Sequence, residues 1–236
     1  MTKHPGSRRV HRAAADDDKF VTGVLETSVW ARSHSRWLVI AGVAALLLIV
    51  GTLYVRNVSA RKTEAAAQQL GLIRGTVQGG NLVLARQDLE KFVNTYGDTP
   101  SGQEGRIMLG QVQLQANEAQ RAIQTLEPLA DDLESPLGYS AALLLAAAYE
   151  ANKQLDESDR VYLRIAENGR FDFQKREALD RAARLRVDRG NTAGAAELYE
   201  RILATFEDDD PKEVDMQLKT GFEMRLAELR AQTARS

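Results

Sequence analysis

The sequence predicts an all-α protein: one N-terminal transmembrane helix, then an α-solenoid of about four helical hairpins, then a C-terminal capping helix. Three observations lead to this fold class. Residues 37–55 carry no charged side chain. The chain after them is rich in residues that favour helix, and only short breaks interrupt it. Finally, one pattern of small and large residues recurs beyond residue 64.

Residues 37–55 are apolar and are bracketed by Arg36 and Arg56. A helix of this length spans roughly 28 Å, close to the hydrocarbon thickness of a bilayer. The segment is therefore predicted to be a transmembrane signal anchor. The alternatives are a buried core helix and a cleaved signal peptide. The stretch is longer than a usual signal peptide, although Val58-Ser59-Ala60 places small residues at a cleavage position.

The charge of the tail, residues 1–36, predicts its side of the membrane. It holds seven Lys and Arg against four Asp and Glu, while the whole chain has a net charge of −2. Lys and Arg favour the cytoplasmic side in short flanks. The residues closest to the span do not decide the orientation, because two cations precede it and three follow it. The whole tail favours a cytoplasmic N-terminus.

The tail has one segment with helical periodicity. Asp16-Asp17-Asp18 precedes apolar residues spaced three and four apart: Phe20, Val21, Val24, Leu25 and Val29. This predicts a short amphipathic helix lying in the cytoplasmic interface. A partly ordered juxtamembrane segment is the alternative.

The chain after the span predicts helices of roughly 12–16 residues joined by tight turns, which favours antiparallel hairpins. Within them a small residue is followed by a large one four positions later and another three positions after that. The sets are Ala85, Leu89 and Phe92; Ala122, Leu126 and Leu129; Ser158, Tyr162 and Ile165; and Ala195, Tyr199 and Ile202. Twelve residues before each set come Ile73, Gly110, Ala146 and Ala183. Small residues facing each other let two backbones approach closely, as a helical solenoid requires.

This pattern resembles tetratricopeptide repeats over about residues 64–205. The residues that carry the resemblance are Leu109-Gly110, Ala122, Tyr149, Tyr162, Gly190-Asn191, Ala195 and Tyr199. The period of 36–37 residues exceeds the typical 34, which indicates extra residues in each inter-repeat loop. The sequence departs from the family pattern in four places: Ser158 replaces an alanine, the first repeat lacks its glycine, and Gln113 and Arg186 stand where Tyr149 stands.

Four segments are therefore predicted: the tail at 1–36, the span at 37–55, the repeat domain at 56–210 and the capping helix at 211–236. Asp210 is the expected cap of the last helix, with Pro211 in its first turn. Its apolar stripe is Val214, Leu218, Phe222, Leu226 and Leu229. This stripe would cover the exposed face of the last hairpin.

The whole layout resembles the bacterial ancillary subunits of the Sec translocon: a short tail, one signal anchor and a tetratricopeptide-like domain. The resemblance implies a single-pass protein of the bacterial inner membrane, with its N-terminus in the cytoplasm and its repeats in the periplasm. Its implied partners are proteins: the translocon, a chaperone or secreted clients. Homo-oligomerisation stays open.

The sequence contains no recognisable catalytic or cofactor motif, so the chain is predicted not to be an enzyme and to bind no metal or cofactor. It has no cysteine, and His4, His11 and His34 all precede the span. The acidic runs at 131–134 and 207–210 fall in loops, where carboxylates cap helices. The low aromatic content and the small net charge argue against nucleic-acid binding.

The resemblance also implies a binding face, because the first helix of each hairpin would line a concave surface. The predicted partner-binding residues are Ile107, Gln111, Leu114, Leu143, Ala147, Glu150, Asp180, Arg184 and Val187. Such mixed side chains suit an extended or helical peptide, and the alternative is a solvated concavity without a ligand. The expected function is a membrane-anchored adaptor that holds a partner or nascent chain near the secretion channel. The alternative is a structural subunit of another membrane complex, with the repeats as packing surface.

Overall fold

The structure is a computed structural model that describes residues 35–207 and 215–234. The predicted amphipathic segment of the tail, the three histidines and the acidic residues 208–210 lie outside this part of the chain. The chain divides into two units between residues 60 and 61, and each is described by itself. All regular secondary structure in the described ranges is helical, which confirms the all-α class.

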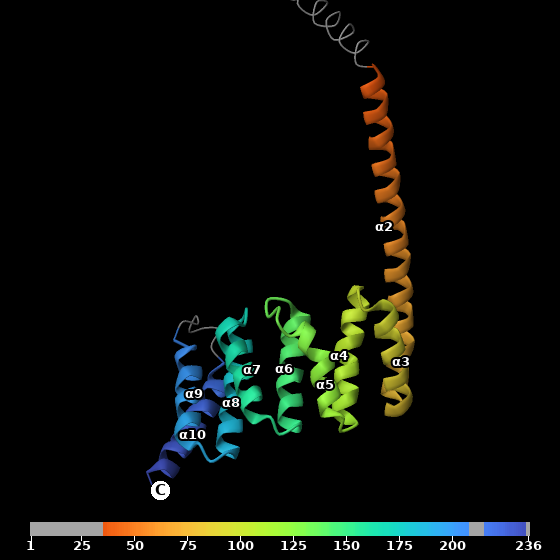
Figure 1. Ribbon diagram of the computed structural model, residues 1–236. Coiled ribbons are helices and arrows are strands. Elements are labelled where there is room, and N and C mark those ends of the chain that lie inside the picture. The colour runs from red at the N-terminus through yellow and green to blue at the C-terminus, as the bar shows by residue number, and fades with distance from the viewer. Residues whose placement is uncertain (1–34, 208–214, 235–236) are drawn as a thin grey trace, which may run out of the picture. The chain divides into compact units, whose positions relative to one another are not determined.

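The elements follow one another closely along the chain (Figure 1). They are α2 (Ser35–Gln78), α3 (Leu82–Tyr96), α4 (Pro100–Gln115), α5 (Ala119–Leu126), the short 3₁₀ helix η1 (Glu127–Leu129), α6 (Pro136–Ala151), α7 (Leu155–Asn168), α8 (Asp172–Asp188), α9 (Thr192–Ala204) and α10 (Met216–Thr233).

Helix α2 passes without a break through residue 55, where the sequence predicts the span to end. Residues 56–78 contain no proline, so nothing in them forces a helix end. Between Trp37 and Val58 the exposed large apolar side chains range from 49% exposed at Val58 to 72% at Trp37. Among the described residues one helix, Gly42–Gln78, is long and apolar enough to cross a membrane, a criterion of length and composition alone.

In the second unit the helices form consecutive antiparallel hairpins. Residues 61–78 of α2 pack with α3 and α4 through one buried cluster, and a second cluster extends along the helices from α5 to α10. The further hairpins are α4 with α5, α6 with α7 and α8 with α9, and α10 packs on α9. The structure therefore contains TPR-like helical repeats of the kind the sequence predicts.

The repeated small residues are fully buried in the array, as the pattern predicts. Ala85, Ala122, Ser158 and Ala195 are each 0% exposed. The large residues that follow them are also buried, except for Leu129, which is half-buried. It differs because Pro128 has no backbone N–H, so α5 ends at Leu126 and the chain continues as η1.

Two inter-repeat turns use the same local chemistry. In Thr99-Pro100-Ser101-Gly102 the Thr99 hydroxyl accepts a hydrogen bond from the Gly102 N–H at 3.0 Å. Ser135 and Gly138 make the equivalent 3.0 Å bond in the turn before α6. A hydroxyl cap followed by proline in the first helical turn starts a helix efficiently. These turns therefore fix where α4 and α6 begin.

The turns inside the hairpins each contain one residue with positive φ: Gly80 (77°), Asn117 (59°), Lys153 (62°) and Gly190 (77°). Glycine adopts this region without strain and asparagine tolerates it, but a lysine pays about 1 kcal/mol. The sequence spacing of the turns is thus reproduced in the backbone, with Lys153 as the strained member.

Replacing Lys153 by glycine is expected to raise the free energy of unfolding by about 1 kcal/mol, because glycine removes the strain of the positive φ. Chemical denaturation of the full chain in detergent micelles would measure it. Lys153→Ala is the matched control and should stay close to the parent, since alanine keeps the strain. A glycine variant no more stable than the alanine variant would contradict the prediction.

The capping helix begins later than predicted. Helix α10 begins at Met216 rather than Pro211, and Asp210 and Pro211 lie outside the described residues. Asp215 is the N-cap, because its carboxylate accepts the Leu218 N–H at 3.0 Å. Leu226 and Leu229 of the predicted stripe are buried, whereas Leu218 is 45% exposed.

Candidate protein-binding surface

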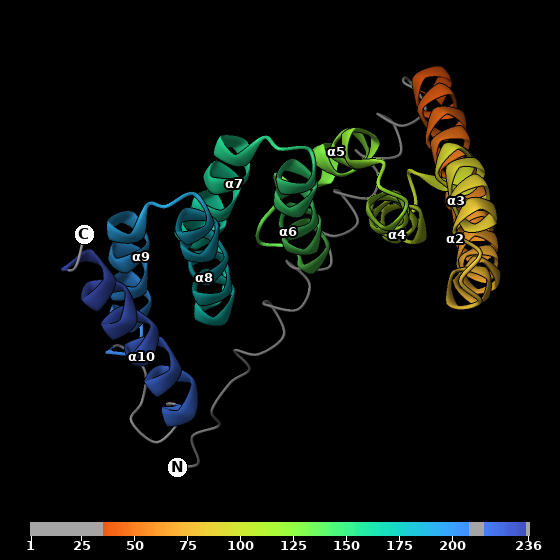
Figure 2. The same cartoon turned by 90° about the horizontal axis from the view of Figure 1, so that it is seen from below.

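The nine residues predicted to bind a partner lie on helices that share one side of the array. Figure 2 shows α4, α6 and α8 along this side and α5, α7 and α9 along the other. Helix α4 carries Ile107, Gln111 and Leu114; α6 carries Leu143, Ala147 and Glu150; α8 carries Asp180, Arg184 and Val187. The three helices differ in how much of these side chains is accessible to a partner.

The apolar members on α4 and α6 belong largely to the fold. Ile107, Leu114 and Leu143 are half-buried and pack against the larger hydrophobic cluster. Helices α4 and α6 also contact each other directly, which leaves little room between them. Gln111 is exposed and Ala147 is half-buried. This part of the face therefore offers a partner few free apolar atoms.

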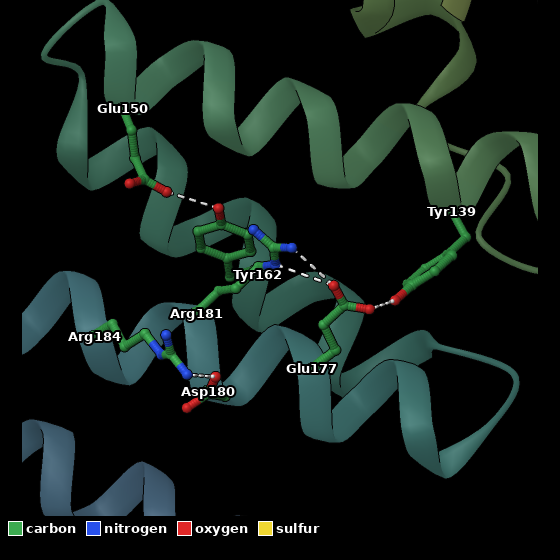
Figure 3. A network of polar contacts seen from close by, with 7 residues as sticks. All are labelled: Tyr139, Glu150, Tyr162, Glu177, Asp180, Arg181 and Arg184. Carbon is green, nitrogen blue, oxygen red and sulfur yellow. Dashed lines mark hydrogen bonds and ion pairs between the residues drawn. The ribbon is translucent and has the colours of Figure 1, made fainter. Parts of the chain in front are cut away.

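Glu150 is engaged inside its own hairpin. Its Oε1 accepts a hydrogen bond from the Tyr162 hydroxyl at 2.6 Å (Figure 3). The same oxygen accepts one from the Ser158 hydroxyl at 3.3 Å. Ser158 is fully buried, and a buried hydroxyl needs such a partner. The carboxylate therefore stabilises the α6–α7 hairpin and compensates for the serine that replaces a repeat alanine.

The predicted residues on α8 border open space. Asp180 and Arg184 line a hollow of about 400 Å³, and Arg184 and Val187 line an adjoining one of about 260 Å³. Helix α10 forms the opposite wall of both, and Arg225 borders each. We call this continuous depression between α8 and α10 the α8–α10 groove. It is the part of the predicted face that can accept a side chain of a partner.

The α10 wall of the groove was not predicted as a binding surface. Phe222 lies in it half-buried, 6.1 Å from the Tyr199 ring and 6.2 Å from the Phe206 ring between centroids. Arg225 stands beside it and forms an ion pair with Glu228 at 3.5 Å. In the sequence, only the apolar stripe of α10 indicated this wall. The stripe was interpreted as a cover for the last hairpin and not as a wall of the groove.

A polar network connects the hairpins next to this groove (Figure 3). The Tyr139 hydroxyl on α6 donates to Glu177 Oε2 on α8 at 2.6 Å, and Arg181 donates to Glu177 Oε1 at 2.9 Å. On the same helix Arg184 pairs with Asp180 at 2.9 Å. The network fixes α6 against α8, so the groove rests on a preorganised wall.

Burial and the neighbouring carboxylates raise the pKa values of the tyrosines that bond to them. Desolvation, followed by the hydrogen bond to Glu177, raises the pKa of Tyr139, and the same two causes with Glu150 raise that of Tyr162. Desolvation and the nearby Asp180 carboxylate raise the pKa of Tyr199 to about 12. Although desolvation acts to raise it, the bonds from Tyr139 and Arg181 hold the pKa of Glu177 below its usual value.

Alkaline pH is therefore expected to weaken the fold. An unfolded tyrosine ionises near pH 10, whereas Tyr199 in the fold keeps its proton until about pH 12, so the stabilisation is complete below pH 10 and is lost as the pH rises toward 12. Tyr199→Phe should lower the free energy of unfolding at pH 7 by about 1 kcal/mol, through the lost bond to Asp180, yet fall less steeply above pH 10. Urea midpoints measured from pH 7 to pH 12 would test both statements, and parallel slopes for parent and variant would contradict the second.

The similarity of this chain to known proteins agrees with its helical-repeat geometry. The sequence model of the tetratricopeptide repeat-like domain matches residues 29–220. The chain belongs to this family. No curated protein matches the chain. Among solved structures, the tetratricopeptide array resembles a Parabacteroides merdae tetratricopeptide repeat protein, with 17% identity, a TM-score of 0.53, and coverage of 72% of this chain and 61% of that one. A Podosopora anserina structure of nearly identical TPR-like repeats has 21% identity, a TM-score of 0.51, and coverage of 72% and 96%.

At these identities the solved structures show a common fold and no more. Tetratricopeptide repeats typically mediate contacts between proteins. Among the described residues of this tetratricopeptide array, no group of three or more His, Cys, Asp or Glu side chains is placed to hold a metal ion. The larger hollow of the α8–α10 groove is lined by two arginines, two carboxylates and one phenylalanine, and the adjoining hollow adds the carboxylates of Asp188 and Glu228. Such a lining combines charged groups of both signs with one aromatic side chain.

Proposed function

We propose that this protein is a membrane-anchored tetratricopeptide adaptor. It binds a protein partner or a nascent chain at the extracytoplasmic face of the bacterial inner membrane, as an accessory of the secretion channel. The observation that carries the proposal is that one chain contains both an apolar segment with exposed side chains and a tetratricopeptide array with an open groove.

Membrane anchoring is supported by residues 37–55. Their large apolar side chains would be costly in water, at roughly 25 cal/mol per Å² of apolar surface. A lipid bilayer removes that cost, and the segment is long enough to cross it. Anchoring also raises the local concentration of the binding surface near other membrane proteins without any new contact.

The proposed orientation in the membrane and the proposed association with the secretion channel rest on the sequence. The basic tail favours a cytoplasmic N-terminus, which would place the repeats outside the cytoplasm. The order of tail, anchor and repeats resembles that of the ancillary subunits of the Sec translocon. A partner that emerges from the channel in extended form would fit the open α8–α10 groove.

A structural role in another membrane complex is the second candidate. The observation that favours it is the half-buried state of Ile107, Leu114 and Leu143, which leaves α4 and α6 little free binding surface. In that case a constant neighbour would cover the array, and the groove would contribute only packing.

Site-specific photo-crosslinking in native membranes would separate the two candidates. A photoreactive amino acid is placed at Arg225, in the groove, at Gln111, on α4, and at Arg201, an exposed control position on α9. The adaptor predicts crosslinks from Arg225 to channel subunits or secreted proteins and few from Arg201. One constant adduct of equal strength from all three positions would favour the structural role, and no adduct at Arg225 would overturn the adaptor.

A further inference from the structure

Two phenylalanines stand exposed where α8 begins. Phe171 is 48% exposed and Phe173 is 60% exposed, and their rings stack with centroids 5.7 Å apart. The guanidinium carbon of Arg170 lies 5.1 Å from the centroid of the Phe171 ring. In the described part of the chain beyond residue 60, no other aromatic side chain is exposed. We call Arg170, Phe171 and Phe173 the aromatic patch.

The equivalent positions in the two preceding turns show that the fold does not require phenylalanine here. Thr99 and Ser135 are the N-caps of α4 and α6, and each hydroxyl accepts a backbone N–H at 3.0 Å. Phe171 is the N-cap of α8, and its side chain has no atom that can accept such a bond. An apolar N-cap costs helix stability, and an exposed ring gains little free energy from burial. Such a departure from the local rules is expected at a functional surface.

The rings of the aromatic patch are held in a fixed position. The buried side chain of Gln174 accepts a hydrogen bond from the Phe171 N–H at 3.1 Å. The Tyr139 ring meets the Phe173 ring edge-on, with centroids 6.4 Å apart. The Tyr139 hydroxyl is itself bound to Glu177. Contacts from α6 and α8 therefore preorganise an exposed apolar surface.

The aromatic patch lies at the end of the array where the chain enters it. Consecutive helices of the array run antiparallel, so α4, α6 and α8 all begin at the same end (Figure 1). Lys62, the second residue of the repeat unit, donates to Asp98 in the turn before α4 at 2.6 Å. Arg164, near the end of α7, donates to Asp131 in the turn before α6 at 2.9 Å. The entry of the chain and the inter-repeat turns therefore share one end.

Membrane anchoring by residues 37–55 brings a bilayer to this end of the array, and the inference rests on that part of the proposed function. Residues 56–60 join the apolar segment to Arg61, and even a fully extended chain of this length covers only about 20 Å. This limit follows from chain length alone. Exposed phenylalanine next to a basic side chain suits the boundary between lipid headgroups and acyl chains.

Charge does not direct this end of the array toward acidic lipid. Three carboxylates here are paired with cations: Asp98 with Lys62 at 2.6 Å, Asp131 with Arg164 at 2.9 Å and Asp172 with Lys175 at 3.0 Å. Asp132, Glu134 and Glu207 are exposed at the same end and would repel acidic headgroups. A contact with lipid would therefore depend on the aromatic rings and not on electrostatic attraction.

We propose that the aromatic patch docks on the bilayer that anchors the chain, with the rings of Phe171 and Phe173 inserted at the lipid interface. The occupant is a zwitterionic lipid surface, which neither attracts nor repels the carboxylates at this end. The apolar segment and the aromatic patch then attach the chain at two points. Together they limit the rotation of the array and hold its inter-repeat turns against the membrane.

Tryptophan fluorescence in vesicles that contain no other protein tests the docking. In the full-length chain, Trp30→Phe and Trp37→Phe remove both native tryptophans, and Phe173→Trp places one reporter in the patch. The vesicles are phosphatidylcholine brominated near the headgroup end of its acyl chains, where bromine quenches a tryptophan that it contacts. An interfacial side chain lies about 5–10 Å into this boundary, so the emission from position 173 should fall by about half relative to unbrominated lipid. High salt should not change the quenching.

Val83→Trp in the same background is the matched control. Val83 is 64% exposed and lies at the start of α3, at the opposite end of the array, so bromine should not change its emission. Flotation with the vesicles is measured on the same samples. If the chain floats but position 173 is quenched no more than position 83, the docking is overturned and the anchoring stands. A chain that does not float would overturn the anchoring and this inference with it.

Phe171→Ser separates docking from a role in the fold. Serine caps α6 at the equivalent position, so this variant should melt at the temperature of the parent or up to about 3 °C above it. With the reporter at position 173, the quenching should fall by about half, because one of the two rings no longer enters the lipid. A variant that melts well below the parent would assign the Phe171 ring to the fold and overturn the docking. Crosslinking at Arg225 reports on protein partners, so the adaptor and the docking can fail separately.

Discussion

Gly110→Ala is expected to lower the free energy of unfolding by about 2 kcal/mol, the usual cost of adding an atom to a full core. A Cβ at this position would stand 2.6 Å from Cγ and from Cδ2 of Leu126. Leu126 is 0% exposed and cannot move aside without displacing α4 from α5. For a domain of this size the loss corresponds to a fall in Tm of about 5 °C. Thermal unfolding of the full chain in detergent micelles, followed by circular dichroism, would measure it.

Gly71→Ala is the matched control. Gly71 lies in the interior of α2, and a Cβ there would meet nothing within 4 Å. The same substitution should therefore stabilise the protein by up to about 1 kcal/mol, because alanine favours helix more than glycine does. Opposite signs for the two substitutions are the expected result. A Gly110 variant as stable as the parent would mean that the α4–α5 seam is not closely packed.

Introducing two arginines near the middle of the apolar segment, at Leu46 and Leu47, is expected to release the chain from membranes. Each arginine at the centre of a span costs about 2.5–3.5 kcal/mol of insertion free energy, so the pair costs about 6 kcal/mol. Both leucines are exposed in the protein, at 60% and 67%, so the substitution does not disturb a core. Membrane fractionation followed by alkaline carbonate extraction would show the change.

Two controls make this result specific. Leu46→Ile should remain in the membrane fraction, because it keeps an apolar side chain of the same size at the same position. The helical signal of the arginine variant should persist, since the repeat unit begins only at Arg61. If the arginine variant stays in the membrane after carbonate treatment, residues 37–55 do not anchor the chain.

The sequence predicts the repeat core well because close packing restricts which residue types can occupy its contact positions. A hairpin whose backbones approach closely accepts only small residues at the contact, and Ala85, Ala122, Ser158 and Ala195 are accordingly fully buried. Close packing does not identify the backbone conformation of the turn residues. Lysine does not itself favour a positive φ, so Lys153 is marked only by its register with its equivalents, which are two glycines and an asparagine.

The binding surfaces were harder to predict, because they depend on neighbours that are distant in sequence. Asp180 and Arg184 line a groove only because α10 returns past α8 and forms its opposite wall. The start of α10 was predicted five residues too early. Glu150 was expected to face a partner, yet Ser158 and Tyr162 donate to it. Gln113 and Arg186 were recognised as departures from the repeat pattern, but the sequence does not show that Arg186 binds Asp159.

A compartment reporter at the C-terminus tests most directly whether the array lies outside the cytoplasm beside the membrane. Alkaline phosphatase, which is active only in the periplasm, and a fluorescent protein that matures only in the cytoplasm are fused in parallel after Ser236. The proposed function predicts high phosphatase activity in the membrane fraction and no fluorescence. Fluorescence without phosphatase activity would place the repeats in the cytoplasm and contradict the proposed orientation together with its extracytoplasmic partners.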